Sequence, residues 1–250
     1  MRVAISQPTF LPWLGYLDLI DQADTFVLLD HVQFEKQSWQ QRNRIKGPAG
    51  LQWLTVPVVF RGRFGQRINE VLIRDSGFPA DHLRAIEFSY RRAPYFGQYF
   101  QQIAEIFGKY PAGSLLADLN IELIRWFCSM FAIGTLLIRA SAQKPEGRRS
   151  DLLVHLCAEL GAKTYVAAPG SAAYLLDDVP KFLSGGIEVA FHHYQHPEYR
   201  QRFPPFVPYA TALDLLFNEG GRSPEILRSG RRQPLSTEEL RLSLASGVSA

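Results

Sequence analysis

Short apolar runs alternate with segments of helical periodicity along most of this chain, and that alternation most constrains its fold. Residues 2–6 and 26–29 are apolar runs of strand length. Between them, Leu14, Leu17 and Ile20 recur at the spacing of one helix face. A strand, a helix and a second strand within about thirty residues have the size of a βαβ unit, whose strands run parallel. We therefore expect an α/β fold with a mainly parallel sheet flanked by helices.

The later segments continue this pattern. We predict further strands at residues 52–58, 67–73, 135–138, 164–167 and 187–191. Helical periodicity predicts two helices within 79–110 and further helices at 114–131, 150–161 and 211–218. In the helix at 150–161, Ser150 is expected to cap the start and Gly161 the end. The polar segments 31–50 and 60–66 are expected to be mobile loops.

The domain organisation follows from the absence of a linker-like composition inside the chain. We expect residues 1–225 to form a single domain. Residues 226–250 are rich in Arg, Ser, Leu and Ala, so we expect a partly disordered C-terminal extension, frayed beyond about Leu242.

Composition excludes several classes of protein. The net charge of +3 is too small for the concentrated basic face of a nucleic-acid-binding protein. The most apolar stretch, residues 115–137, contains Asp118, Glu122 and Arg125, so we expect no membrane span. An apolar strand begins at residue 2 without a signal peptide before it, and Cys128 and Cys157 form no disulfide-type pattern. These features predict a cytoplasmic protein.

The first predicted strand ends in a loop that could hold a ligand. In parallel sheets, ligands bind beyond the carboxyl ends of the strands. Prolines restrict this loop, Gly15 permits a close approach, and the following helix directs its positive N-terminus toward this edge. The candidate ligand-binding residues here are Gln7, Pro8, Trp13, Gly15 and Tyr16, with packing of Trp13 and Tyr16 onto the sheet as the alternative.

The segment after the second strand is basic and could bind an anion. Arginine grips phosphates and carboxylates through paired hydrogen bonds, and an exposed tryptophan can stack on a sugar or a base. The candidate ligand-binding residues are Gln33, Lys36, Trp39, Arg42, Asn43, Arg44 and Lys46, with Gly170 in a weak phosphate-loop pattern after a later strand. A solvated basic loop is the alternative. We expect one cleft to be lined by Gln7, Trp13, Tyr16, His31, Gln33, Lys36 and Arg44, with Trp39 partly exposed there.

Candidate catalytic residues are His31, Tyr16 and His196. Histidine is the usual general base near neutral pH. Asp30 precedes His31, but neighbours on an extended segment point to opposite faces, so the two form a weak pair. His192 and His196 would share a face only on a helix, so we predict no metal site. The chain lacks GxSxG, HExxH, Walker and GxGxxG motifs, which removes the usual motif support for hydrolases, NTPases and dehydrogenases.

The long N-terminal motifs resemble the WbqC-like family. These motifs are Gln7-Pro8-x-Phe10-Leu11-Pro12-Trp13-x-Gly15-Tyr16, then Asp30-x-Val32-Gln33-Phe34-x-Lys36-x-Ser38-Trp39-x-x-Arg42-Asn43-Arg44-Ile45-Lys46, then Trp53-x-Thr55-Val56-Pro57-Val58. Later landmarks are Tyr165, Pro169-Gly170, His196-Pro197-x-Tyr199-x-Gln201 and residues 214–220. The resemblance covers about residues 3–221 and implies a bacterial protein of O-antigen or other surface-polysaccharide biosynthesis, with a glycine transferase role suggested for one member.

A fainter resemblance links the first helix to adenylyl-transferring α/β enzymes such as pantothenate synthetase. Trp13-Leu14-Gly15-Tyr16 occupies the place of their HxGH signature, which implies a nucleotidyltransferase-like fold. Trp13 and Tyr16 replace the two histidines that contact the nucleotide phosphates there, and neither carries a positive charge. The cofactor therefore stays unknown, with ATP and Mg²⁺ as a possibility that the resemblance raises.

We expect a transferase that adds an amino acid or an acyl group to a sugar or nucleotide sugar. The alternatives are a non-catalytic sugar-nucleotide-binding or assembly protein, and a glycosyltransferase. The third lacks a clear metal-binding DxD motif, because Asp177-Asp178 stands where a helix should start. The expected partner is a small-molecule sugar or nucleotide sugar, without nucleic acid. The sequence gives no oligomeric state.

Overall fold

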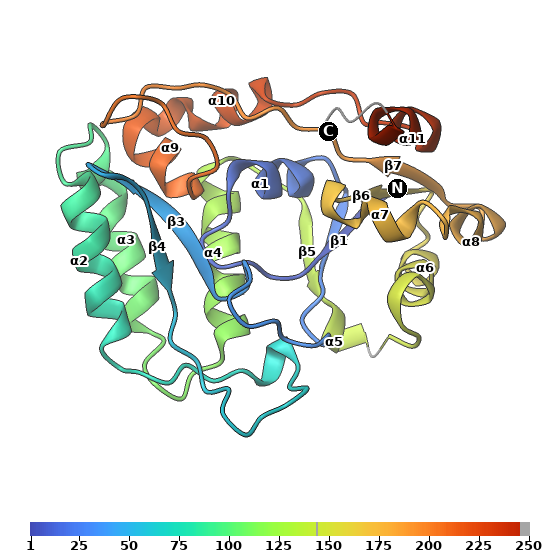
Figure 1. Cartoon of the computed structure of the whole chain (residues 1–250), viewed down its shortest axis with the longest axis horizontal. Helices are drawn as coiled ribbons and strands as arrows, with labels where there is room; N and C mark the ends of the chain where they lie inside the picture. Colours follow the sequence, from blue (N-terminus) through green and yellow to red (C-terminus); the bar gives the residue numbers. More distant parts are fainter. Residues whose placement is uncertain (144, 246–250) are drawn as a thin grey trace.

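A five-stranded sheet forms the centre of the computed structural model, which describes residues 1–143 and 145–245 (Figure 1). The strand order is β5-β2-β1-β6-β7, and every neighbouring pair is parallel. The strands are β1 (Arg2–Ser6), β2 (Thr25–Leu28), β5 (Leu136–Arg139), β6 (Thr164–Ala167) and β7 (Glu188–Phe191). The predicted α/β class with a parallel sheet is confirmed.

The first two strands and the helix between them form the expected βαβ unit. Val3 of β1 is aligned with Thr25 of β2, and α1 (Leu14–Asp21) connects the strands. Neighbouring side chains of β1 point to opposite faces, because the side-chain period of a strand is two. Ala4 enters the core under α1, whereas Val3 and Ile5 enter a second core on the other face.

Helices cover both faces of this sheet. The first core is built with α1, α2 (Phe78–Tyr90), α3 (Phe96–Gly108), α4 (Leu116–Met130), α9 (Ala212–Glu219) and α10 (Ser223–Ser229). The second core is built with α6 (Arg149–Glu159), α7 (Ala172–Leu175), α8 (Val179–Ser184) and α11 (Thr237–Ala245). Short elements complete the chain: α5 (Ala140–Gln143), η1 (Ile68–Glu70), η2 (Pro169–Ser171) and η3 (Gly220–Arg222).

The basic segment 31–50 is not a loop throughout, as we had expected. β3 (Arg42–Gly47) and β4 (Gly50–Thr55) form an antiparallel hairpin that stands apart from the parallel sheet (Figure 1). Gly50 closes the turn with a φ of +102°, a conformation that glycine adopts without strain. The alternation was hard to see in the sequence because the inward positions of β3 include the polar Asn43, which is buried.

Two further local predictions are wrong. The expected strand at 67–73 is interrupted by the short helix η1, because the Glu70 carboxylate accepts a hydrogen bond from the Arg67 amide at 2.8 Å and closes a turn. Only Arg67, Leu72 and Ile73 of this segment form isolated β-bridges. Ser150 does not cap α6, since that helix begins one residue earlier and its N-cap, Arg148, makes no side-chain capping bond. Gly161 does end this helix, with a φ of +67°.

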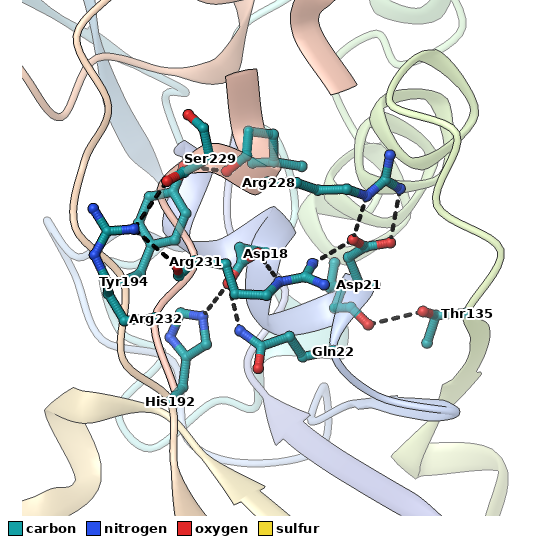
Figure 2. Close-up of polar contacts among 12 residues, drawn as sticks. Asp18, Asp21, Gln22, Thr135, His192, Tyr194, Arg228, Ser229, Arg231 and Arg232 are labelled. Carbon is teal, nitrogen blue, oxygen red and sulfur yellow. Dashed lines mark hydrogen bonds and ion pairs between the residues drawn. The ribbon is translucent and has the colours of Figure 1, made fainter. Parts of the chain in front are cut away.

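The C-terminal part of the chain packs against the first helix through four charged side chains, which we call the clamp: Asp18, Asp21, Arg228 and Arg231 (Figure 2). Arg228 donates hydrogen bonds to both carboxylate oxygens of Asp21, at 2.9 and 3.0 Å. Arg231 bonds Asp18 at 2.9 Å and also reaches Asp21. The clamp thus ties α10 and the residues after it to α1.

The expected boundary at residue 225 therefore falls inside α10, and Leu227 just beyond it is buried in the first core. Residues 237–245 are helical, so the expected fraying beyond Leu242 is not seen as far as Ala245. The part of that prediction on residues 246–250 lies outside the described residues. Within the described ranges, no helix is long and apolar enough to cross a membrane.

Truncating the chain tests the clamp. A chain that ends at Glu225 loses Arg228 and Arg231 and leaves Asp18 buried without its cationic partner. We expect it to be at least about 3 kcal/mol less stable than the intact chain, the usual cost of an unpaired buried charge. A chain that ends at Ser236 keeps the clamp and loses only α11, so its loss should be smaller. Urea unfolding measures both, and equal stability of the two truncations would contradict this account.

The pH dependence of stability tests Asp21. Burial alone would raise the pKa of Asp21, but hydrogen bonds from Arg228 and Arg231 outweigh it and lower the pKa below its ordinary 3.8. The stabilisation is therefore present above that value and is lost as pH falls through the folded-state pKa. Asp21→Asn should cost about 1–2 kcal/mol at neutral pH, and the difference from wild type should shrink below about pH 4.

Thermal unfolding across this pH range checks the expectation. The control is Asp81→Asn, which removes a second Asp–Arg pair whose side chains are 64% and 76% exposed, and it should change stability little. A deficit for Asp21→Asn that stays constant down to acidic pH would show that its charge is not what stabilises the fold.

Candidate functional site

The direction in which strands are added to the sheet reverses between the neighbouring strands β1 and β6, and a cavity opens at that point. In chain order, β2 is added beside β1 and β5 beside β2. β6 and β7 then extend the sheet on the other side of β1. Such a switch point is where ligands bind in open parallel sheets. The cavity has a volume of about 390 Å³ and is lined by Ser6, Thr9, Trp13, Gly15, Tyr16, Leu19, Trp39, Asn43, Ala168, Gly170, His192, His193, Tyr194 and Tyr209. We call it the switch-point cavity.

Trp13 and Gly15 shape one wall of this cavity. The Trp13 indole folds over Gly15 so closely that a Cβ atom on Gly15 would stand 2.1 Å from the ring. The ring also meets Tyr194 and Tyr209 edge-on, with centroids 5.9 and 5.6 Å away. Gly15 is therefore needed because a side chain there would displace the Trp13 ring.

Tyr16 anchors the loop between β1 and α1. Its hydroxyl donates to the Gln7 carbonyl oxygen at 3.0 Å. Burial raises its pKa far above the usual range, so the hydroxyl keeps its proton. The Gln7 side chain accepts from Gln40 at 2.7 Å, and the Pro8 carbonyl accepts from Asn120 at 3.2 Å. Gln7, Pro8 and Tyr16 are thus engaged in holding the loop, which does not favour Tyr16 as a catalytic base.

The β3–β4 hairpin supplies the opposite rim. Trp39, just before β3, is 46% exposed and lines the cavity. The Arg44 guanidinium lies 5.6 Å from the Trp39 ring centre and donates to the Tyr209 carbonyl oxygen at 3.5 Å. Asn43, which lines the cavity, donates to the Leu11 carbonyl oxygen at 2.8 Å. Arg44 is therefore the cation at this rim, and Asn43 ties the hairpin to the loop after β1.

The expected single cleft is divided by the structure. Of its seven residues, Trp13 and Tyr16 line the cavity, while Gln7 and Arg44 contact its wall and rim. The other three do not line it: Gln33 pairs with Arg67, Lys36 lies 3.8 Å from the centre of the Phe60 ring, and His31 precedes Gln33 on the same segment. Contacts with residues 60–68 hold the segment 31–36 away from the cavity.

Two other predicted cations also lie outside the cavity. Arg42 stacks on Trp53, 4.2 Å from the ring centre. Lys46 is 3% exposed, and its ammonium donates to Gln201 at 2.9 Å and to the Pro205 carbonyl. Burial lowers the pKa of Lys46, with nearby Asp214 opposing the shift. Its position argues for a structural role, because its donors are committed inside the protein.

The two predicted histidine bases occupy different surroundings. His196 lies behind Trp13, stacked at a ring distance of 6.4 Å, and its Nδ1 contacts the Pro197 carbonyl oxygen at 3.0 Å. Burial lowers its pKa, and burial is also the main cause that lowers the pKa of His31. Asp30 does not orient His31: its buried carboxylate is held by Arg139 at 2.8 Å and by Ser141.

Sequence reasoning missed a histidine–aspartate pair in the wall of the cavity. His192, directly after β7, lines the cavity, and its Nε2 lies 2.8 Å from a carboxylate oxygen of Asp18 on α1 (Figure 2). Both side chains are almost fully buried. A signal was present, since Asp18 interrupts the apolar run Leu17, Leu19, Ile20 and must have a partner if that helix is buried.

The arrangement has the features of a small-molecule site. Rings from four segments of the chain surround a hollow at the switch point, one guanidinium stands at its rim, and a histidine–aspartate pair is set in its wall. Among residues 1–143 and 145–245, no group of three His, Cys, Asp or Glu side chains is placed to hold a metal ion.

Comparisons with known proteins place the chain in a family. No solved structure matches it. The chain is 37% identical over 232 residues to the uncharacterized protein Rv1507c of Mycobacterium tuberculosis, a match that covers 92% of this chain and 99% of that protein. The model of the WbqC-like protein family matches residues 7–226, which contain every lining residue of the cavity except Ser6. The chain belongs to the WbqC-like protein family.

Proposed function

We propose that this protein is a transferase that binds a nucleotide sugar, or a related phosphorylated sugar, in the switch-point cavity and adds an aminoacyl or acyl group to it. The family resemblance to proteins of surface-polysaccharide biosynthesis suggests the sugar and the pathway. The location and lining of the cavity are what support a small-molecule transferase.

The observation that carries this proposal is the aromatic lining beside a single rim cation. Trp13, Trp39 and Tyr209 present ring surfaces to one hollow of about 390 Å³, which lies within the range of small-molecule sites. Aromatic rings bind sugars and bases by stacking, with little dependence on the identity of the base. A guanidinium at the mouth suits the phosphate that joins a base to a sugar.

Arg44 is available for such a phosphate. Within the described part of the chain it forms no ion pair with a carboxylate. Its Nε is enclosed without a hydrogen-bond partner, so a ligand would have to use the terminal amino groups. Its contacts are the faces of Trp39 and Trp53 and one carbonyl oxygen. Stacking on two indoles holds the guanidinium plane and uses none of the terminal N–H donors, so those not bonded to Tyr209 are left for a ligand.

Use of ATP receives less support from the site. In the adenylyl-transferring enzymes that α1 resembles, histidines stand where Trp13 and Tyr16 stand here. Trp13 packs on Gly15, and the Tyr16 hydroxyl is bonded to the Gln7 carbonyl. Neither side chain supplies a cation, so we test ATP as a ligand separate from nucleotide sugars.

Replacing Arg44 tests the proposed phosphate contact. Arg44→Ala should weaken binding by about 1–3 kcal/mol, the range for a hydrogen bond to a charged group. Arg44→Lys should restore only part of this, because an ammonium cannot make the paired contact of a guanidinium. The loss should be larger at low salt, where exposed charges are less screened.

Calorimetry with UDP-, dTDP- and GDP-sugars, and separately with ATP, measures these effects. Arg84→Ala is the matched control, since Arg84 is exposed on α2 and pairs with the exposed Asp81. Unchanged affinity in Arg44→Ala would place the anion site elsewhere. If the intact protein bound none of these ligands, the nucleotide-sugar part of the proposal would be wrong.

Replacing Trp39 tests the stacking contact. Trp39→Ala should cost about 1–3 kcal/mol of nucleotide-sugar binding, the usual worth of stacking one base on an aromatic ring. Phe88→Ala, which removes a 66%-exposed ring from α2, should leave binding unchanged. The same calorimetric titrations give both values, and equal affinities for the two variants would remove Trp39 from the site.

A further inference from the structure

Asp18 is an acceptor for three donors at once. Its Oδ1 accepts from Arg231 Nε at 2.9 Å, and its Oδ2 accepts from the Gln22 amide at 2.6 Å. Oδ2 also lies 2.8 Å from His192 Nε2 (Figure 2). A guanidinium and an amide NH₂ group can only donate, so both carboxylate oxygens act as acceptors. The proton in the contact with His192 therefore sits on Nε2.

This contact fixes the state of the other ring nitrogen. With the proton on Nε2, Nδ1 of the neutral imidazole carries a lone pair. In the described part of the chain Nδ1 makes no hydrogen bond, and it is not among the enclosed unpaired atoms. The ring is held by stacking on Tyr194, with planes 10° apart, and it lines the switch-point cavity. The Nδ1 lone pair of His192 is therefore part of the wall of the switch-point cavity.

The clamp contains two carboxylates and two guanidiniums, which balance each other. A proton that arrives on Nδ1 would still be stabilised, because Asp18 holds the opposite side of the ring. A buried carboxylate behind an imidazole is the arrangement by which enzymes orient a histidine base and stabilise its protonated form.

We propose that His192 is the general base of the switch-point cavity and that Asp18 is its positioning residue; the identity of the substrate rests on the proposed function. In the step, Nδ1 takes the proton from a hydroxyl or amine of the sugar. The freed oxygen or nitrogen bonds to the carbonyl carbon of an activated acyl or aminoacyl donor. The bond from that carbon to its leaving group breaks, the leaving group keeps the electron pair, and the imidazolium returns the proton to it.

Nitrogen NMR of the full-length protein with ¹⁵N-labelled histidine tests the tautomer. We expect His192 to carry its proton on Nε2, with a bare Nδ1. Asp18→Asn should convert this to a mixture of tautomers, because an amide can either donate or accept. Asp21→Asn is the matched control: it removes a carboxylate of the same clamp that does not touch His192, and the tautomer should stay. A protonated Nδ1 in the intact protein, or the same spectrum in Asp18→Asn, would overturn the proposal.

Carbethoxylation with diethyl pyrocarbonate, mapped by mass spectrometry, tests whether the lone pair is reachable. His82 is the control, because it is also buried, its Nδ1 contacts the Phe78 carbonyl oxygen, and its Nε2 is enclosed. His192 should react at least about tenfold faster than His82, which must wait for local opening. A rate at His192 no faster than at His82 would overturn the proposal.

Adding UDP-, dTDP- or GDP-sugar separates this inference from the proposed function. A nucleotide sugar that binds by calorimetry should slow the reaction at His192. If it binds and leaves the rate at His192 unchanged, the ligand does not cover Nδ1 and the inference fails. If none binds while the tautomer and the reactivity are as expected, the proposed substrate fails and the base stands.

Discussion

The buried carboxylate of Asp18 joins the three parts of the chain on which the candidate site depends. It lies on α1, it bonds His192 at the end of β7, and it bonds Arg231 beyond α10. A charge taken out of water needs partners with good geometry, so these segments have little freedom to move relative to one another. The same interaction that fixes the C-terminal segment also orients the histidine in the cavity wall.

A second constraint acts on the other side of the cavity. The loop after β1 is held by backbone acceptors: Gln7 for Tyr16, Pro8 for Asn120, and Leu11 for Asn43. These donors come from α1, α4 and β3, so a proline-restricted loop is fixed by three separate elements. Trp13 can then rest on Gly15 and keep its ring toward the cavity. The residues of the N-terminal motifs thus fall into two groups. Some face the cavity, and others hold its wall in place.

The strands of the parallel sheet could be predicted closely because their bounds depend on residues that are neighbours in the sequence. Apolar runs at residues 2–6 and 164–167 are strands with those same bounds, and Gly161 ends the helix that precedes β6. The hairpin β3–β4 could not be predicted so well, since Asn43 and Lys46 are polar yet buried. Their burial depends on partners at Leu11 and Gln201, which are distant in sequence. The strand expected at 67–73 failed because a single carboxylate, Glu70, closes a turn there.

The sequence by itself determined the fold class, because strand length and helix period depend on neighbouring residues. It also predicted the edge of the sheet at which the candidate site lies. Only the tertiary structure decided which of those residues meet. It separated His31 and Lys36 from the cavity and brought His192 to Asp18, 174 residues apart in the chain. Such pairings depend on how the sheet edge and the C-terminal segment close around α1. The physical reason is that a buried charge is stabilised by the group that the folded structure places at hydrogen-bonding distance. The spacing of residues along the chain does not indicate which group that is.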